Sequence, residues 1–174
     1  TYKKVSWDFK VKQFIAQAYT SAEQAHFGWR LMFNDSEVAM LMGGTQGDYH
    51  PFSTYSEHYN AVKSANPLNQ SLYVDVKTWL VDDILTKVDR ATMACSLEAR
   101  VPFLAWDMVE FAMRLPSKLK LRGTQRKYIL KKAMESQLPD NIIHRKKRGF
   151  NTPIGIWMQK NLQGTVDELL LQSS

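Results

Sequence analysis

The 174-residue sequence contains a single cysteine, Cys95, so an internal disulfide bond cannot form. Chains without disulfides are typical of reducing compartments, and we therefore predict a cytoplasmic protein. Cys95 lies in the half-apolar stretch TMACSLEA, where we expect a small buried side chain rather than a reactive thiol.

Long hydrophobic runs are also absent. No segment approaches the roughly 18 apolar residues that a transmembrane helix needs, and the opening TYKKVSWDFK does not have the pattern of a signal peptide. Hydrophobic residues still make up 44% of the chain and aromatic residues 11%, which is enough for a folded core. We expect a folded domain with no membrane partner.

Several familiar site signatures are missing. The sequence has neither a Gly-Lys-Ser phosphate loop nor a dinucleotide-binding glycine pattern. No Ser-His-Asp or Cys-His arrangement can be recognised, and no histidine pair has the spacing of metal ligands. We therefore assign no metal-binding residue to this chain.

Helical periodicity dominates what is present. Ser21 is placed to cap one helix, Asn34 or Ser36 to cap the next, and Gly43-Gly44 to end it. Apolar spacing predicts one helix around residues 68–80, a second around residues 84–93, and helix within LKLRGTQRKYILKKAMESQLP. No alternating strand pattern is convincing, so the predicted fold class is all-α.

Positive charge is concentrated in one segment. Residues 118–148 hold eleven Lys/Arg and two Asp/Glu, a net charge of +9, whereas the rest of the chain holds twelve and fifteen, a net charge of −3. The stretch HRKKRGFNTP ends this segment, and its Gly-Phe and Thr-Pro pairs indicate a fixed backbone. A solvated charge run, a nucleic-acid surface and a loop that binds an anion all fit this pattern.

Carboxylates gather just upstream. Asp82 and Asp89 lie seven residues apart and would share a face of an unbroken helix. Such acids could bind Mg²⁺ or orient an amine, but they could equally be caps or form salt bridges with Lys87 or Arg90. Glu98 and Arg100, placed before a Pro-Phe turn that we expect to be buried, have the pattern of a structural ion pair.

Two longer stretches resemble a known family. DDILTKVDRATMACSLEARVPFL (residues 82–104) and LPDNIIHRKKRGFNTPIGIW (residues 138–157) resemble, in order and spacing, the synthetase domain of the glutamine-dependent asparagine synthetase family. That family shows an Asp-Asp run, a Leu-Glu-x-Arg-x-Pro-Phe-Leu passage and an Arg-x-Lys-x-Gly-Phe motif. The resemblance covers nearly all of residues 1–174 as a single helical region. Residues 1–66 are the variable part and residues 67–174 carry the motifs.

The resemblance implies an enzyme, a carbon–nitrogen ligase with glutamine as amido donor. In the family, ATP converts a substrate carboxylate into an acyl-adenylate and pyrophosphate. Ammonia, released from glutamine in a separate N-terminal domain, then attacks to give the amide. ATP and Mg²⁺ are the implied cofactors of the full-length protein, and asparagine biosynthesis is the implied role.

Residue roles follow from the same resemblance. The motif lysine faces the phosphates in the family, so Lys147 is the implied catalytic residue, and a preplaced ammonium suits the negative charge that develops there. Arg145 would bind substrate or phosphate, or hold an acid in place. Asp83 and Asp89 match positions near the synthetase cleft, so the resemblance implies that they bind substrate or phosphate, through Mg²⁺ or a substrate amine, or that they act as scaffold.

Four further residues match motif positions that we interpret as structural: Glu98, Arg100, Gly149 and Phe150.

Two departures from the family pattern are visible. The family usually has Asp directly after Pro-Phe-Leu, where this chain has Ala105; Asp107 could replace it as a helix cap, or the cap is lost. The Ser-Gly-Gly-x-Asp-Ser nucleotide loop, its parallel sheet and the glutaminase cysteine are also missing. We therefore expect the helical C-terminal part of an adenine-nucleotide α-hydrolase-like synthetase domain, inactive alone.

The expected partners are the glutaminase domain and nucleotide-loop part of the same protein, a small-molecule carboxylate and glutamine. We also expect exposed faces to favour a homodimer. The alternatives are a relative that amidates another carboxylate such as a sugar uronate, a basic helical module that binds nucleic acid, and a helical interaction domain without ligand. The core-like spacing of Tyr128 and Phe150 speaks against nucleic acid.

Overall fold

The computed structural model describes residues 7–44, 50–147 and 154–170, and the structural statements that follow concern these ranges. The chain forms two compact units, the larger being Trp7–Lys132 and the smaller containing the described residues from Ala133 onward. Within the described ranges no helix is both long and apolar enough to cross a lipid bilayer.

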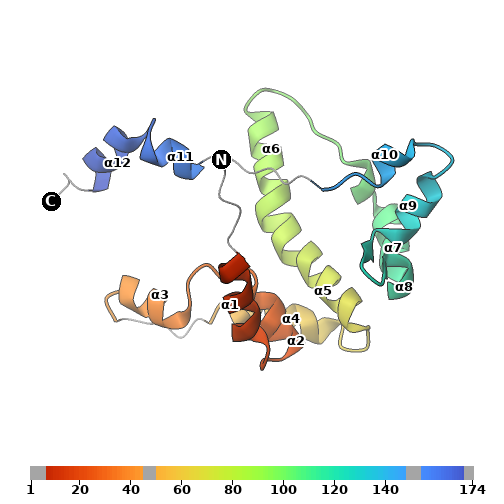
Figure 1. The fold of residues 1–174 in the computed structure, drawn as a ribbon, viewed down its shortest axis with the longest axis horizontal. Helices are drawn as coiled ribbons and strands as arrows, with labels where there is room; N and C mark the ends of the chain where they lie inside the picture. Colours follow the sequence, from red (N-terminus) through yellow and green to blue (C-terminus); the bar gives the residue numbers. More distant parts are fainter. Residues whose placement is uncertain (1–6, 45–49, 148–153, 171–174) are drawn as a thin grey trace. The chain divides into compact units, whose positions relative to one another are not determined.

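Four helices open the larger unit: α1 (Trp7–Gln17), α2 (Ala22–Gly28), α3 (Asp35–Leu41) and α4 (Phe52–Ala61) (Figure 1). The predicted caps are confirmed at Ser21 and Asn34, each of which accepts a hydrogen bond from the third backbone N–H of its helix in a complete capping box. The predicted stop at the end of α3 is also confirmed. Gly43 has φ +65°, and the Gly44 N–H donates to the Ala39 carbonyl at 2.8 Å.

A long continuous helix follows, made of α5 (Pro67–Asp75), a π-type stretch η1 (Val76–Leu85) and α6 (Thr86–Met93) (Figure 1). Asn66 caps it, and Pro67 occupies the first turn, where a missing N–H is harmless. The prediction of two separate helices is wrong, because no glycine or proline interrupts residues 68–93. The change in apolar spacing near residue 80 coincides with the π-type stretch rather than with a chain break.

The long helix ends in a turn that the sequence did not indicate, because no glycine marks it. Ser96 adopts the left-handed conformation (φ +56°) usually given to glycine, and Leu97 N–H bonds back to the Thr92 carbonyl at 3.0 Å. Cys95 lies in this turn and is exposed, so the expectation of a buried thiol is wrong. The neighbouring residues of this turn, from Met93 to Leu97, are exposed as well, so no apolar surface covers the thiol.

The rest of the larger unit is short elements. They are η2 (Pro102–Leu104), α7 (Trp106–Arg114), α8 (Ser117–Lys120), β1 (Leu121–Arg122), β2 (Gln125–Arg126) and α9 (Tyr128–Met134), whose last two residues belong to the smaller unit. The strands form a minimal antiparallel hairpin in which Leu121 faces Arg126, turning at Gly123 (φ +58°). The helix expected within LKLRGTQRKYILKKAMESQLP is α9, which begins at Tyr128 after the hairpin, while the first two residues of that stretch end α8. The all-α class is confirmed apart from these two-residue strands.

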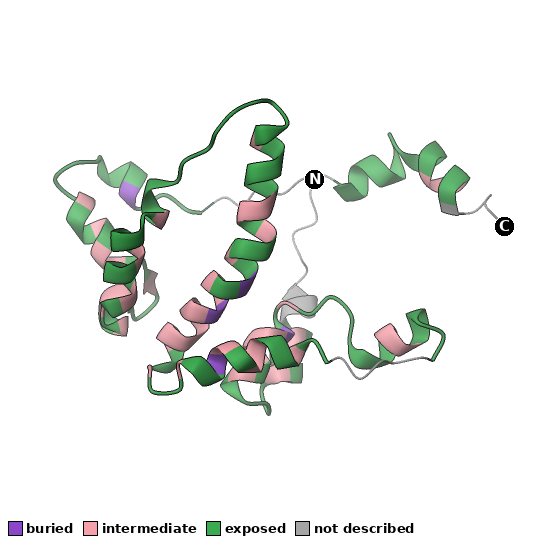
Figure 2. Cartoon of the chain, turned by 180° about the vertical axis from the view of Figure 1, so that it is seen from behind, coloured by how far each residue is buried: buried purple, intermediate pink, exposed green. Residues whose placement is uncertain are grey.

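The core of the larger unit lies where α2, α4 and α5 meet (Figure 2). Tyr59 and Val74 are fully buried there, and the Thr78 hydroxyl is buried with its proton donated to the Val74 carbonyl at 2.8 Å. Aromatic edges pack beside them, with the Phe27 ring 5.0 Å from that of Tyr55.

The smaller unit contains α10 (Asp140–Ile143), α11 (Ile154–Gln159) and α12 (Gln163–Leu170). The last two pack against each other around a small apolar hollow of about 280 Å³. The Thr-Pro pair that precedes α11 in the sequence lies outside the described residues.

Candidate functional site

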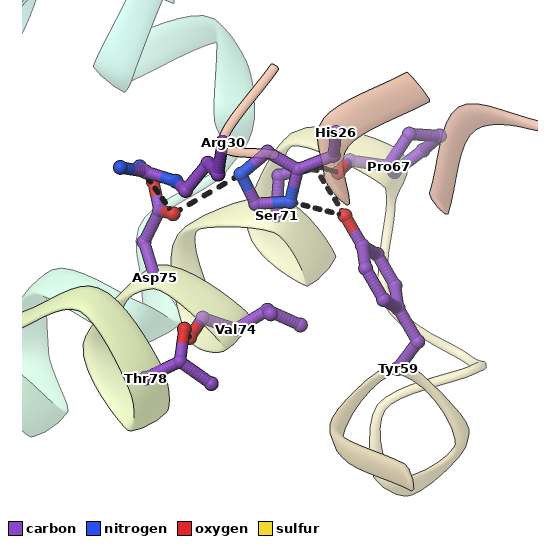
Figure 3. A network of polar contacts seen from close by, with 8 residues as sticks. All are labelled: His26, Arg30, Tyr59, Pro67, Ser71, Val74, Asp75 and Thr78. Atoms are coloured by element: carbon purple, nitrogen blue, oxygen red, sulfur yellow. Dashed lines mark hydrogen bonds and ion pairs between the residues drawn. The ribbon is translucent and has the colours of Figure 1, made fainter. Parts of the chain in front are cut away.

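A polar network joins three helices of the larger unit at its core (Figure 3). His26 of α2 lies between two partners: its Nε2 is 3.0 Å from Oδ1 of Asp75, the last residue of α5, and its Nδ1 is 2.6 Å from the Tyr59 hydroxyl of α4. A carboxylate only accepts hydrogen bonds, so Nε2 carries the donated proton. The imidazole is thereby fixed at both ends.

Arg30 completes the charge balance of Asp75. Its Nη2 donates to Asp75 Oδ1 at 2.6 Å, and its guanidinium lies 4.4 Å from the centre of the Trp79 ring. Burial alone would raise the pKa of the Asp75 carboxyl. The hydrogen bond from His26 and the positive charge of Arg30 outweigh burial, so this pKa lies below its ordinary value.

The far end of the network is closed to solvent. Tyr59 is 2% exposed, and its hydroxyl is 3.2 Å from that of Ser71, which donates to the Pro67 carbonyl. Burial raises the pKa of Tyr59, with the nearby negative charge of Asp75 acting in the same direction. The phenol has no open side for a substrate, so the network's role is to fix α2, α4 and α5 against one another.

Lys147 and Arg145 lie in the smaller unit, in the irregular segment that follows α10. Both side chains are exposed, and in the described part of the chain neither forms an ion pair with a carboxylate. Two cations two residues apart can therefore meet an incoming anion without first breaking a salt bridge. Gly149 and Phe150, the expected structural part of this motif, lie outside the described residues.

Asp83 and Asp89 lie on the long helix of the larger unit. Asp83 forms an ion pair with Lys87 at 2.7 Å, whereas Asp89 is exposed near the start of α6. The helix is unbroken, as the shared-face argument required. However, Asp82 lies in the π-type stretch, so seven residues from Asp82 to Asp89 no longer equal two α-helical turns.

Glu98 and Arg100 form an ion pair of 2.9 Å on the surface. The turn beside them was expected to be buried, but Val101 is 42% and Phe103 63% exposed. This expectation is wrong because η2 packs against the adjoining α7 rather than across the core. An exposed pair of this kind contributes little to stability.

The residues predicted to bind ligands thus divide between the units, with Asp83 and Asp89 in the larger and Arg145 and Lys147 in the smaller. Among the described residues, no three acidic, histidine or cysteine side chains are grouped as metal ligands. A Mg²⁺ site therefore does not fit the described carboxylates by themselves, whereas the exposed Arg145 and Lys147 do fit phosphate oxygens.

Sequence reasoning missed the network and one half-buried amine. Lys120 Nζ donates to Asn69 Oδ1 at 2.7 Å, tying α8 to α5, and burial lowers its pKa. Such partners lie 33 to 51 residues apart in sequence, as with His26–Tyr59 and Asn69–Lys120. These pairs can be identified only from the packing of the helices, because no local sequence pattern indicates them.

Comparison with known proteins agrees with the motif resemblance. Residues 4–174 match the family described as asparagine synthase. The glutamine-hydrolysing asparagine synthetase 1 of Bacillus subtilis (strain 168) is 32% identical over 166 residues, covering 93% of this chain and 26% of that protein. A putative glutamine-hydrolysing asparagine synthetase of Mycobacterium tuberculosis (strain ATCC 25618 / H37Rv) is 32% identical over 148 residues, covering 85% and 23%.

A more distant relative carries a different name. The amidase chry2 of Gibberella zeae is 26% identical over 122 residues, covering 66% of this chain and 18% of that protein. The chain spans about a quarter of the length of the Bacillus subtilis and Mycobacterium tuberculosis relatives. No solved structure matches it.

Proposed function

This chain belongs to the asparagine synthase family, and from that premise we propose that it forms part of a glutamine-hydrolysing amidotransferase that makes an amide from a carboxylate at the expense of ATP. The observation that carries the proposal is the continuous match over residues 4–174, which includes the Arg-x-Lys-x-Gly-Phe segment. Under this proposal the protein works in the cytoplasm.

The remainder of the protein would supply the other parts of the enzyme. Because the chain spans about a quarter of its relatives' length, we assign the glutaminase domain and the nucleotide-binding loop to sequence outside these 174 residues. Glutamine, ATP with Mg²⁺ and a small carboxylate are the proposed ligands of the whole protein. The residues that coordinate Mg²⁺ would lie chiefly in that remainder.

Lys147 is the proposed catalytic residue. Activation of a carboxylate by ATP releases pyrophosphate, and attack by ammonia builds negative charge on the carbonyl oxygen. An ammonium that forms no ion pair with the described carboxylates can stabilise both without prior rearrangement. Arg145, exposed in the same segment, would add a second cation for phosphate oxygens.

Asp83 and Asp89 have a proposed role in binding the substrate, where a carboxylate can accept hydrogen bonds from an amine. Asp89 is the better placed of the two for a ligand, because it is exposed and forms no ion pair among the described residues. Asp83 would first have to release Lys87.

The test uses the full-length protein and measures pyrophosphate released from ATP, with glutamine or ammonia, over a panel of carboxylates. Lys147→Ala should lower kcat by about 100-fold or more, as loss of one preplaced donor does elsewhere. Lys146→Ala is the matched control, because it removes an adjacent exposed cation. Its activity should stay within a few-fold of the parent.

The acceptor panel should include aspartate and a sugar uronate. Ala105 departs from the usual family residue, and one relative is named an amidase, so aspartate is not assumed. Equal activity in the Lys147→Ala and Lys146→Ala variants would remove Lys147 from the chemistry. No release with any acceptor, from a folded full-length protein that hydrolyses glutamine, would refute the proposed synthetase activity.

A further inference from the structure

The hairpin region of the larger unit carries charge of one sign. From Leu115 to Lys132 the chain contains seven Lys/Arg and no Asp/Glu. The acid just upstream, Glu110, is already bound to Arg114 at 2.5 Å. An anion approaching this region meets no carboxylate from the segment itself.

A shallow pocket of about 290 Å³ lies within this segment, lined by Lys118, Leu119, Arg122 and Tyr128. The left-handed turn at Lys127 (φ +58°) directly precedes Tyr128, the first residue of α9, after the hairpin has reversed the chain. The pocket thus combines two cationic side chains, one phenol and one apolar wall.

Arg122 is held in place before any ligand arrives. Its Nη1 donates to the Tyr128 hydroxyl at 2.6 Å, and its guanidinium carbon lies 5.0 Å from the centre of the Tyr128 ring. No carboxylate of the described residues forms an ion pair with Arg122 or Lys118. Most guanidinium N–H groups are therefore available. Tyr128, which accepts from Arg122, keeps its own proton to donate.

We propose that this pocket binds the dianion of a small phosphate monoester. Lys118 and Arg122 supply two positive charges for its two negative charges, and the Tyr128 O–H supplies a further donor. Leu119 offers an apolar wall for the carbon group of the ester. The volume suits a small molecule rather than a length of polymer, and this inference does not depend on the amidotransferase activity.

The first test is titration of the isotopically labelled chain with methyl phosphate, followed by NMR. Dimethyl phosphate and acetate, which carry a single charge, are the controls at matched ionic strength. Methyl phosphate should shift the signals of Lys118, Arg122 and Tyr128. Its affinity should rise from about pH 5 to about pH 7.5, because the second ionisation of a phosphate monoester lies near pH 6.

Variants separate the donors. Arg122→Ala should weaken methyl phosphate binding by about tenfold or more. Arg122→Lys keeps the positive charge but loses the planar set of guanidinium N–H donors, so it should restore only part of the lost affinity. Tyr128→Phe keeps the ring and should weaken binding several-fold. Arg90→Ala removes an exposed cation on α6 and should leave binding unchanged.

Three results would overturn the proposal. The first is that dimethyl phosphate or acetate shifts the NMR signals as much as methyl phosphate does. The second is that Arg90→Ala weakens methyl phosphate binding as much as Arg122→Ala does. The third is that methyl phosphate shifts no signal of the hairpin in the folded chain. Shifts confined to residues 144–147 would also count against it, and would support a phosphate site at Lys147 instead. Failure of this pocket and failure of the proposed amidotransferase are thus distinguishable.

Discussion

Asp75 joins segments of the chain that no local sequence pattern connects. One carboxylate oxygen accepts from both His26 of α2 and Arg30, and it belongs to the helix that also buries Val74. Removing an acceptor that serves two partly buried donors leaves both without their partner, and that loss is larger than the value of an exposed ion pair.

Asp75→Asn should therefore lower the free energy of unfolding by about 1–3 kcal/mol. The amide keeps the shape of the side chain but loses the charge that holds Arg30 and His26. Urea unfolding followed by circular dichroism measures the change. Asp89→Asn, at an exposed carboxylate of the same long helix, is the control and should change stability by less than about 0.5 kcal/mol. Equal effects of the two would contradict the role given to Asp75.

The lowered pKa of Asp75 makes this contribution depend on pH. The carboxyl titrates near pH 3.9 in an unfolded chain and at lower pH in the folded one. Its stabilisation is therefore fully present above about pH 4 and is lost as the pH falls through the folded pKa. The stability difference between the parent chain and Asp75→Asn should shrink as the pH falls below about pH 4. A difference that grew on acidification would contradict this sign.

Sequence patterns located the residues that act on their neighbours in the chain. Ser21, Asn34 and Gly43 were identified because capping and left-handed turns need particular side chains at particular positions. His26 and Asp75 could not be paired in the same way, since 49 residues separate them and nothing but helix packing brings them together.

Helix α7 begins without a side-chain cap. Ala105 occupies the cap position in an extended conformation (φ −56°, ψ 138°), and no side chain accepts a hydrogen bond from the first turn. Asp107 lies inside the helix and does not take over the cap. The loss considered from the sequence is therefore the arrangement found in the structure.

Ala105→Asp should raise the free energy of unfolding by about 1 kcal/mol, because the new carboxylate can accept from the first-turn N–H groups and faces the positive end of the helix. A shift of the urea midpoint measures it. Ala105→Leu, which adds bulk but no acceptor, is the comparison and should give no gain. Equal urea midpoints for Ala105→Asp and Ala105→Leu would contradict the stabilising effect expected of a side-chain cap on α7.

The elements themselves were predictable where glycine, proline or caps mark their ends. The long helix was divided in error because apolar spacing shifts across Val76–Leu85, and a π-type register imitates a helix boundary in sequence. The hairpin was not predicted because two-residue strands are too short to show an alternating pattern. Only Gly123 indicates the turn locally.

The larger unit leaves many large apolar side chains in solvent. Phe103, Trp106 and Phe111, around η2 and α7, are 63%, 83% and 60% exposed. Exposed apolar groups of this size favour association with another surface. The burial expected from the sequence for the turn that contains Phe103 is therefore not found.

The isolated chain should therefore self-associate as its concentration rises, which sedimentation velocity measures. The double substitution Trp106→Ser and Phe111→Ser should weaken association by about tenfold or more, since it removes two large apolar contacts. Glu57→Ser with Lys63→Ser alters two exposed polar positions and should have no such effect. A chain that stays monomeric throughout would argue against the expected homodimer.

The π-type stretch of the long helix also gives the chain a tolerance for changes in length. Each π turn holds more residues than an α turn, so deletion of one residue within Val76–Leu85 can be absorbed by a return to α-helical bonding. The same deletion in α5 or α6 would rotate everything beyond it by about 100°. Asp75 and Asp89 can therefore keep their relative directions when the sequence between them loses one residue of this stretch.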